Sequence, residues 1–345
     1  MRKKNTLLIT LVISILLGSC QANPGSVEAP PEVEPALLPD GMSVEEAYTL
    51  ASLELVDEYP LYTMVYQADY SIPEASRAGD VMGLVREQWA CSLFATFGSG
   101  EDTLMGRNFD WDFSPGLLLF TDPADGYASV SMVDLYYLGF GYDNAFGLTK
   151  LTLEDLVELL DAPYLPFDGM NEAGLAVGMA AVPERGMTPD PEKETVDSLM
   201  VIRMILDQAA TVDEAVEIIR GINIDWGSGP ALHYLIAEAS GRSALIEFSD
   251  TSIQVIENQE PWQAATNFLV SETWTDPAVH CSRYGLIAER LGHKEGSVSM
   301  EEAMALLEDV AQENTQWSVV YGISTGKVDI VMGRKFQKSA HFDLD

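Results

Sequence analysis

The sequence groups its strands and its helices into separate blocks instead of alternating them one by one. Short strand-like runs closed by turn pairs such as Ser240-Gly241 and Thr325-Gly326 indicate antiparallel hairpins. This order predicts an α+β fold in which two stacked sheets are covered by helices on their outer faces. The expected strands are 91–97, 103–109, 117–121, 127–135, 174–182, 233–239, 243–249, 252–258, 263–270, 317–324 and 327–332, and the expected helices are 43–59, 73–87, 152–161, 197–209, 211–222, 283–292 and 299–312.

The N-terminus has the pattern of an export signal. A basic start precedes an apolar run, 7–17, which is too short to remain as a membrane-spanning helix. The Leu-Gly-Ser-Cys that follows predicts a bacterial lipobox with a lipid on Cys20, and the alternative is an ordinary signal peptide with an incidental cysteine. We therefore expect a lipoprotein signal at 1–20, a Pro- and Glu-rich flexible tether at 21–42, and an exported protein on the outer face of a bacterial membrane.

Charge and residue counts exclude several classes of function. The chain has 19 Lys and Arg against 54 Asp and Glu, a formal net charge of −35, which excludes nucleic-acid binding through a basic patch. The three cysteines and four histidines have no spacing typical of a zinc site, and no Gly-rich phosphate loop is present, so we expect no metal and no cofactor.

Cys91 opens a predicted strand–turn–strand unit that also carries Arg107 and Asp110. A cysteine in a strand is usually a small buried hydrophobe. Close to a cation and a carboxylate it is instead a candidate nucleophile, because the cation stabilises the thiolate. Two alternatives stay open: a disulfide between Cys91 and Cys281, which would block the nucleophile, and a purely structural ion pair between Arg107 and Asp110.

Further short motifs follow Cys91 in a fixed order. They are Arg107 and Asp110 at 16 and 19 residues after Cys91, Asp-Gly-Met-Asn-Glu-Ala-Gly-Leu at 168–175, Thr-Asn at 266–267, Ser-Arg-Tyr at 282–284, and the Thr-Gly hairpin at 325–326. In these motifs, residues 91–345 resemble the choloylglycine hydrolase, or linear amide C–N hydrolase, family of N-terminal nucleophile hydrolases. That family includes bile salt hydrolases, penicillin V acylases, and the acid ceramidase and N-acylethanolamine amidase relatives.

The resemblance implies a four-layer αββα sandwich of two antiparallel sheets and a reaction at Cys91. The thiol would first cleave its own chain between Ala90 and Cys91. The freed α-amine, with a reference pKa of about 7.7–8.0, would then act as the base for the thiol. Cys91 would attack the carbonyl of a small N-acyl amide, and the acyl group would be released by water from a thioester.

The resemblance also assigns roles to the other site residues. Asn267 would stabilise the oxyanion together with a backbone N–H, Asp110 would hydrogen-bond the α-amine, Arg107 would favour the thiolate, and Arg283 would fix the carboxylate and the floor of the site. Asn267 could instead cap a turn, and Arg283 could merely start a helix. Many members have a second side-chain donor where this chain has Ala181, so that donor is not assigned.

The resulting division is a helical propeptide or small subunit at 43–90 and a catalytic domain at 91–345. After cleavage the 21–90 segment would stay associated with 91–345 and so keep the enzyme at the membrane. Two other functions use the same fold: a non-catalytic lipoprotein that binds a lipid or amphiphile, and an acyltransferase. Specificity is expected in the loops 112–150 and 183–197. There Tyr136, Tyr137 and Phe140 could line an acyl pocket or belong to the core.

Overall fold

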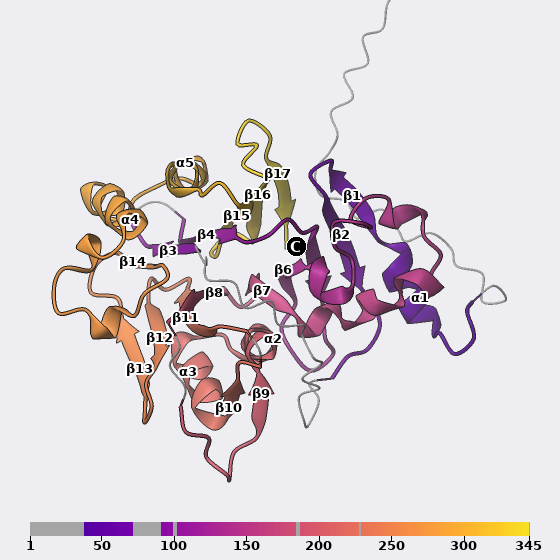
Figure 1. The fold of residues 1–345 in the computed structure, drawn as a ribbon, viewed down its shortest axis with the longest axis horizontal. Coiled ribbons are helices and arrows are strands. Elements are labelled where there is room, and N and C mark those ends of the chain that lie inside the picture. Colours follow the sequence, from indigo (N-terminus) through magenta and orange to yellow (C-terminus); the bar gives the residue numbers. More distant parts are fainter. Residues whose placement is uncertain (1–37, 72–90, 99–101, 184–186, 228, 345) are drawn as a thin grey trace, which may run out of the picture.

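Two stacked β-sheets form the centre of the molecule (Figure 1). The computed structural model describes residues 38–71, 91–98, 102–183, 187–227 and 229–344. Within these residues the larger sheet contains nine strands and the smaller sheet six, and β9 and β10 form a separate pair. The strands are β1 Glu54–Asp57, β2 Leu61–Tyr66, β3 Ser92–Thr96, β4 Leu104–Asp110, β5 Gly116–Thr121, β6 Ser129–Asp134, β7 Pro166–Asn171, β8 Leu175–Val182, β9 Thr195–Asp197, β10 Asn223–Asp225, β11 Ala231–Glu238, β12 Ser243–Phe248, β13 Ile253–Glu257, β14 Trp262–Ala265, β15 Thr315–Gly322, β16 Lys327–Met332 and β17 Ala340–Asp343.

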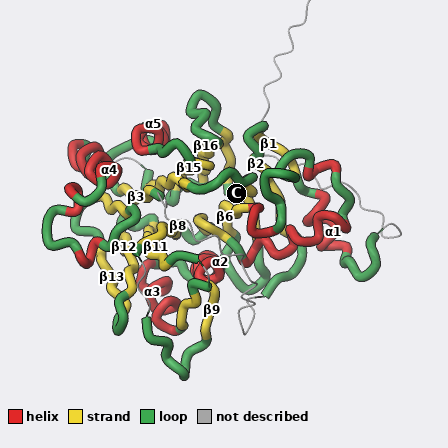
Figure 2. Tube along the Cα trace, viewed as in Figure 1, coloured by secondary structure: helices red, strands yellow, loops and turns green. Residues whose placement is uncertain are grey.

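Helices cover the outer face of each sheet, which gives four layers (Figure 2). The α-helices are α1 Val44–Ala51, α2 Ser198–Gln208, α3 Val212–Gly221, α4 Ser282–His293 and α5 Met300–Val310, and the longest 3₁₀ helix is η4 Glu154–Tyr164. Helices α2 and α3 pack on β7, β8 and β11 of the larger sheet, whereas α4 and α5 pack on β3, β14, β4 and β15 of the smaller one. The α+β fold with an αββα sandwich, which we expected from the resemblance, is therefore confirmed.

The strand order of the two sheets sets the position of the site. The larger sheet runs β1-β2-β5-β6-β7-β8-β11-β12-β13 and the smaller one β14-β3-β4-β15-β16-β17. All neighbours in both sheets are antiparallel except β2 and β5, which run parallel, so the larger sheet is mixed at this one position among the described residues. The strand after Cys91 lies between β14 and β4, near an edge of the smaller sheet.

The two sheets approach closely at the site. A side chain added at Gly178 on β8 would come within 2.6 Å of a methyl group of Leu93 on β3, so a larger residue at this crossing would force Leu93 to shift. Leu93, Arg107 and Phe109 face the larger sheet from this side and are almost completely buried. Residues next to Cys91 are therefore held between two rigid layers.

The segment before Cys91 differs from the expected long helix 43–59. The predicted capping box of Ser43 and Glu46 is present, but α1 ends at Ala51 and the chain continues into β1 and β2. Pairing of β2 with β5 extends the larger sheet, and this tertiary contact overrides the helical pattern. The predicted helix 152–161 is a 3₁₀ helix, η4. The predicted helix 73–87, Cys20, the signal 1–20 and the tether up to residue 37 lie outside the described residues.

Tyrosine hydroxyls attach the segment 38–71 to the rest of the fold. Tyr62 donates to the Ala145 carbonyl at 3.0 Å, Tyr66 to the Leu160 carbonyl at 2.9 Å, and Tyr70 to Asp207 of α2 at 3.0 Å. In Figure 1 this segment, in indigo, forms one end of the molecule with α1, β1 and β2. None of the described helices is long and apolar enough to span a bilayer.

Candidate active site

Cys91 lies directly before β3, and both of its main-chain polar groups are held by other parts of the chain. Its N–H donates to Asn267 Oδ1 at 2.8 Å, and its carbonyl accepts from Arg283 Nη1. Since Ala265 pairs with Leu93 across β14 and β3, the same register places Asn267 opposite Cys91. The residue is only 6% exposed, so its thiol lies at the inner edge of the sandwich.

Arg283 connects three groups of the site from the first turn of α4. Besides the Cys91 carbonyl, it donates to Ser92 Oγ at 2.9 Å and, through Nη2, to Asn267 Oδ1 at 2.9 Å. Its Nη1 also lies 3.9 Å from Asp110 Oδ2. A planar guanidinium with several donors in a fixed fork can satisfy such a set, whereas a single ammonium cannot. Arg283 therefore does more than start a helix.

The hydrogen bonds of Asn267 define which way its amide points. Its oxygen accepts from Cys91 and Arg283, and its nitrogen donates to the Ala181 carbonyl at 2.8 Å. One Nδ2 hydrogen remains beyond the Ala181 bond, since an amide nitrogen has two. The position expected to carry a second side-chain donor, Ala181, thus contributes its backbone carbonyl, which orients Asn267.

Arg107 pairs with Asp168 instead of Asp110. This ion pair joins β4 of the smaller sheet to β7 of the larger one, and both side chains are fully buried. Arg107 also donates to the Phe167 carbonyl at 3.2 Å, and its guanidinium lies 5.0 Å from the centroid of the Phe109 ring. The Tyr321 hydroxyl donates to the second oxygen of Asp168. The open alternative of an Arg107–Asp110 pair is therefore wrong, because Asp110 lies at the end of the strand and points elsewhere.

Asp110 is positioned by a distortion of the neighbouring strand. The register of β15 shifts between Thr315 and Trp317, directly opposite Asp110, and such a bulge re-aims a side chain. Thr315 donates to Asp110 Oδ1, while Oδ2 is buried without a hydrogen-bond partner among the described residues. Burial raises the pKa of Asp110 to about 6, although Thr315, Arg283 and Arg107 oppose this rise.

The surroundings of the Cys91 thiol favour its protonated form. Burial raises the pKa of Cys91, the charge of Arg107 and the backbone N–H of Asp110 lower it, and the carboxylate of Asp110 raises it, with a net increase. The Arg107 guanidinium thus supports a thiolate without producing one at rest. A nucleophilic reaction at this thiol requires a base within reach.

The structure decides the alternatives for the second cysteine and for the aromatic residues. Cys91 and Cys281 are both free, so the disulfide alternative is wrong for this structure. Tyr137 contacts Phe167, which in turn contacts Phe109 beside the site. Phe140 belongs to a separate core under α1 and η4. Tyr136 contacts Tyr137, so Phe140 lies in a different cluster from the other two.

Sequence reasoning missed Asp168, Thr315 and Tyr321. Asp168 begins a motif that we had matched, but its partner lies on the other sheet, and no spacing along the chain indicates that contact. Thr315 and Tyr321 reach Asp110 and Asp168 from β15. The alternation of side chains along β15 gives no guide to this arrangement, because the register shift between Thr315 and Trp317 interrupts it.

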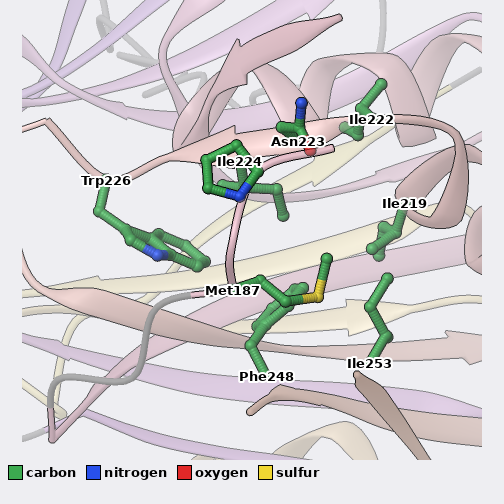
Figure 3. Close-up of a pocket in the computed structure, with 9 residues that line it drawn as sticks. Met187, Ile219, Ile222, Asn223, Ile224, Trp226, Phe248 and Ile253 are labelled. Atoms are coloured by element: carbon green, nitrogen blue, oxygen red, sulfur yellow. The ribbon is translucent and has the colours of Figure 1, made fainter. Parts of the chain in front are cut away.

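An apolar pocket, whose lining residues are drawn in Figure 3, contains none of the residues of this site. It is lined by Ile219 of α3, Trp226 after β10, and Phe248 and Ile253 of β12 and β13, together with Met187 from the predicted specificity loop 183–197. Because α3 lines it, the pocket lies on the helix-covered outer face of the larger sheet, whereas Cys91 lies between the sheets. No group of three or more His, Cys, Asp or Glu among the described residues is arranged to hold a metal ion.

Comparison with known proteins agrees with this fold. Residues 166–335 match the family model of acyl-coenzyme A:6-aminopenicillanic acid acyl-transferase. Conjugated bile acid hydrolase from Clostridium perfringens, in a mutant form, has a TM-score of 0.52 at 16% identity, over 73% of this chain and 92% of that protein. Penicillin V acylase from Agrobacterium tumefaciens has a TM-score of 0.45 at 17% identity, over 70% and 83% of the two chains. At these sequence identities the structural matches show similarity of fold only. The bile acid hydrolase, with the higher TM-score, supports this similarity. The chain therefore has the N-terminal nucleophile hydrolase fold, which the resemblance to the choloylglycine hydrolase family implied.

Proposed function

We propose that this protein is an exported cysteine amidase that hydrolyses the linear amide bond of an N-acyl compound after self-cleavage before Cys91. The observation that carries the proposal is the convergence of Asn267, Arg283 and Asp110 on Cys91. The N–H and carbonyl of a cysteine inside a strand are normally paired by neighbouring strands, whereas here two polar side chains take both bonds, and burying such side chains without a use would cost free energy. The proposal explains why three polar side chains from three elements meet around one cysteine.

The first step of the proposed reaction is attack of the Cys91 thiol on the Ala90 carbonyl. The thiol proton passes to the departing nitrogen of Cys91, the peptide C–N bond breaks, and water hydrolyses the resulting thioester. This releases a carboxylate at Ala90 and an α-amine at Cys91. The amine has a reference pKa of about 7.7–8.0, so it accepts a proton from the thiol near neutral pH.

The same groups then serve the external amide. The Cys91 α-amine takes the thiol proton, sulfur attacks the substrate carbonyl, and the remaining Asn267 N–H supports the oxyanion, at a typical value of ~3 kcal/mol for one donor. The α-ammonium returns the proton to the leaving amine, and water releases the acid. The buried free oxygen of Asp110 is suited to accept a hydrogen bond from the α-amine and keep it in place.

The proposed substrate is a small N-acyl amide with an apolar acyl group. Trp111 follows Asp110 directly and stacks on Phe109, which brings aromatic surface to the site. The bile acid hydrolase neighbour acts on a conjugated bile acid, as its name states, and we extend only the amide chemistry to this chain. Acyl transfer is the second candidate, because the matching family model is that of an acyltransferase and the thioester would be common to both reactions.

We also propose that the protein is a lipoprotein anchored through Cys20, and that the segment before Cys91 remains bound after cleavage. This second point is supported by β2, which pairs with β5 along its whole length, and by the hydrogen bonds of Tyr62, Tyr66 and Tyr70. A strand inside a sheet is released only when the sheet itself opens. Cleavage would therefore leave the catalytic part attached to its anchor.

Intact mass spectrometry of the full chain isolated from bacterial membranes tests these proposals together. We expect two fragments in the wild type, one beginning at Cys91 and one carrying a lipid mass on Cys20, which stay together through size-exclusion chromatography. Cys91→Ala should remain one chain, and Cys281→Ala, the matched control, should be cut like the wild type. A wild type that is uncut and unlipidated would contradict both proposals.

Product analysis then separates hydrolysis from acyl transfer. The processed protein is incubated with N-lauroylglycine in the presence and absence of hydroxylamine. Release of glycine and laurate in both cases indicates hydrolysis, whereas release that occurs only with hydroxylamine, as the hydroxamate, indicates an acyltransferase. Binding of N-lauroylglycine without turnover by a processed chain would favour the non-catalytic lipoprotein.

A further inference from the structure

A buried carboxylate holds the chain immediately after Asn267. Glu247, on β12, accepts the backbone N–H of Val270 at 2.8 Å and that of Ser271 at 2.9 Å. These two N–H groups open a short 3₁₀ helix, Val270–Glu272, whose first donors have no partner inside the helix. Glu247 thus fixes the segment three residues beyond the Asn267 amide.

A histidine supports this carboxylate from the next strand. His233 on β11 lies beside Glu247 on β12, with Nδ1 3.3 Å from Glu247 Oε1. Neither side chain is exposed to solvent. Burial raises the pKa of Glu247, but the hydrogen bonds from His233 and Ser271 outweigh it and hold this pKa below its ordinary value. The group that holds Val270 and Ser271 is therefore an ionised carboxylate.

Burying His233 and Glu247 costs free energy that apolar residues at positions 233 and 247 would not cost. His233 Nε2 is buried and has no hydrogen-bond partner among the described residues, and such a group carries a penalty of about 1–3 kcal/mol. Replacing both partners of a buried hydrogen bond by apolar residues of similar shape is often neutral or stabilising. The His233–Glu247 pair therefore has a cost in stability and fixes the segment that follows Asn267. This makes it a candidate for orienting Asn267.

The loop carries Asn267 at one end and a fully exposed side chain at the other. Leu269 is buried against Val182, which follows Ala181, the residue whose carbonyl orients the Asn267 amide. Five residues beyond Leu269, Trp274 is 98% exposed. The carboxylate of Glu247 binds between these two points, so it lies between the site and the outer loop.

We propose that Glu247, supported by His233, is a positioning residue that keeps Asn267 aligned with the Cys91 main chain. The inference rests on the proposed function, in which Asn267 supports the oxyanion. Glu247 does not contact the thiol or the substrate and acts only through the 267–271 segment. A misplacement of about 1 Å at a catalytic group costs about 100-fold in rate, which sets the size of the expected effect.

The test uses the processed full-length protein and p-nitrophenyl butyrate, an activated ester whose burst of p-nitrophenolate measures acylation of Cys91. Glu247→Gln keeps the shape of the side chain but replaces one acceptor oxygen by an N–H group. We expect its acylation rate constant to fall about 10- to 100-fold, with less than about threefold change in the ester concentration at half-saturation. Glu257→Gln, on neighbouring β13 with an exposed carboxylate, is the control and should match the wild type.

A double-mutant cycle identifies the route of the effect. If Glu247 acts through Asn267, then Glu247→Gln in an Asn267→Ala background should lower the acylation rate by no more than about twofold. His233→Asn, whose amide can replace the Nδ1 donor, should retain most of the rate, whereas His233→Leu should lose it. Equal losses from Glu247→Gln in both backgrounds would overturn the inference.

Hydrogen exchange keeps this test separate from the proposed reaction. In Glu247→Gln, a peptide covering 267–272 should exchange at least about tenfold faster than in the wild type, and in Glu257→Gln at the wild-type rate. Unchanged exchange in Glu247→Gln would contradict the positioning role whatever the ester assay gives. Absence of a burst in the wild type would contradict the proposed function. The hydrogen-exchange rate of the 267–272 peptide would then still test whether Glu247 holds this segment.

Discussion

The two arginines beside Cys91 are held in opposite ways. Arg107 is completely buried, pairs with Asp168 across the two sheets, and lies against the rings of Phe109 and Trp317. Arg283 is 14% exposed and donates to the Cys91 carbonyl, Ser92 and Asn267 at the edge of the sandwich. Both come from motifs of the same resemblance, and the motifs alone give no reason to treat them differently.

The difference indicates two functions for two cations. Arg107 and Asp168 form an ion pair that joins the two sheets. The positive charge of Arg107 also favours the thiolate form of Cys91. The partners of Arg283 are the groups that would react or orient the reaction. We therefore expect substitutions in the Arg107–Asp168 pair to lower mainly the free energy of unfolding. Substitutions of Arg283 should lower mainly the rate of acylation.

The largest effect should come from breaking the buried pair. Asp168→Asn leaves the Arg107 charge buried and unpaired, and removal of one partner of such a pair costs about 3–5 kcal/mol. Urea denaturation of the processed protein measures this loss as a lower midpoint at an unchanged slope. The matched control is Asp213→Asn, which breaks the exposed pair with Arg242 and should cost less than about 1 kcal/mol.

A small loss in Asp168→Asn would contradict the comparison. If its midpoint equals that of Asp213→Asn, the Arg107 pair does not hold the sheets together. The role of Arg107 would then have to be purely electrostatic, as the sequence motif alone had suggested.

A second substitution should separate rate from stability on the other side. Arg283→Lys keeps the charge but replaces a fork that reaches Cys91, Ser92 and Asn267 by one ammonium group. We expect the acylation rate with p-nitrophenyl butyrate to fall about 100-fold, with the free energy of unfolding within about 1 kcal/mol of the wild type. Arg290→Lys, on the same helix in an exposed pair with Asp309, should alter neither.

The residues that meet at Cys91 could be predicted from the sequence, but their partners could not. Cys91, Arg107, Asp110, Asn267 and Arg283 stand in motifs whose order along the chain is visible. Asp168 pairs with Arg107 only because β7 and β4 face each other across two sheets. A contact of this kind has no period and no local spacing, so the linear pattern gives no information about it.

The same limit explains the segment before Cys91. Ser43 and Glu46 form the capping box that the sequence indicates, because a helix cap is a local signal. The end of that helix is decided by the pairing of β2 with β5, more than 50 residues later in the chain. Local patterns therefore predicted the start of the element correctly and its length wrongly.

The smallest expected effect concerns pH dependence and involves Asp110, the buried carboxylate near Arg283. Burial raises the pKa of Asp110 to about 6, so this carboxylate is charged above that pH and protonated below it. Acylation should already decline below about pH 8 as the Cys91 α-amine is protonated, and if the charged carboxylate holds that amine, the decline should become steeper below about 6. Thr315 donates to Asp110 and lowers its pKa, so Thr315→Val should move this acid limb to higher pH, by about half a unit to one unit for one hydrogen bond.

A matched control lies on the same strand as Thr315. Ser318→Ala removes a buried hydrogen bond to Asn108 that does not involve Asp110, and its acid limb should stay at the wild-type position. A shift of equal size in both variants would mean that the limb reports general loosening of β15. A shift in Thr315→Val alone would tie the acid limb to Asp110, and so place a titrating group on the same side of Cys91 as Arg283.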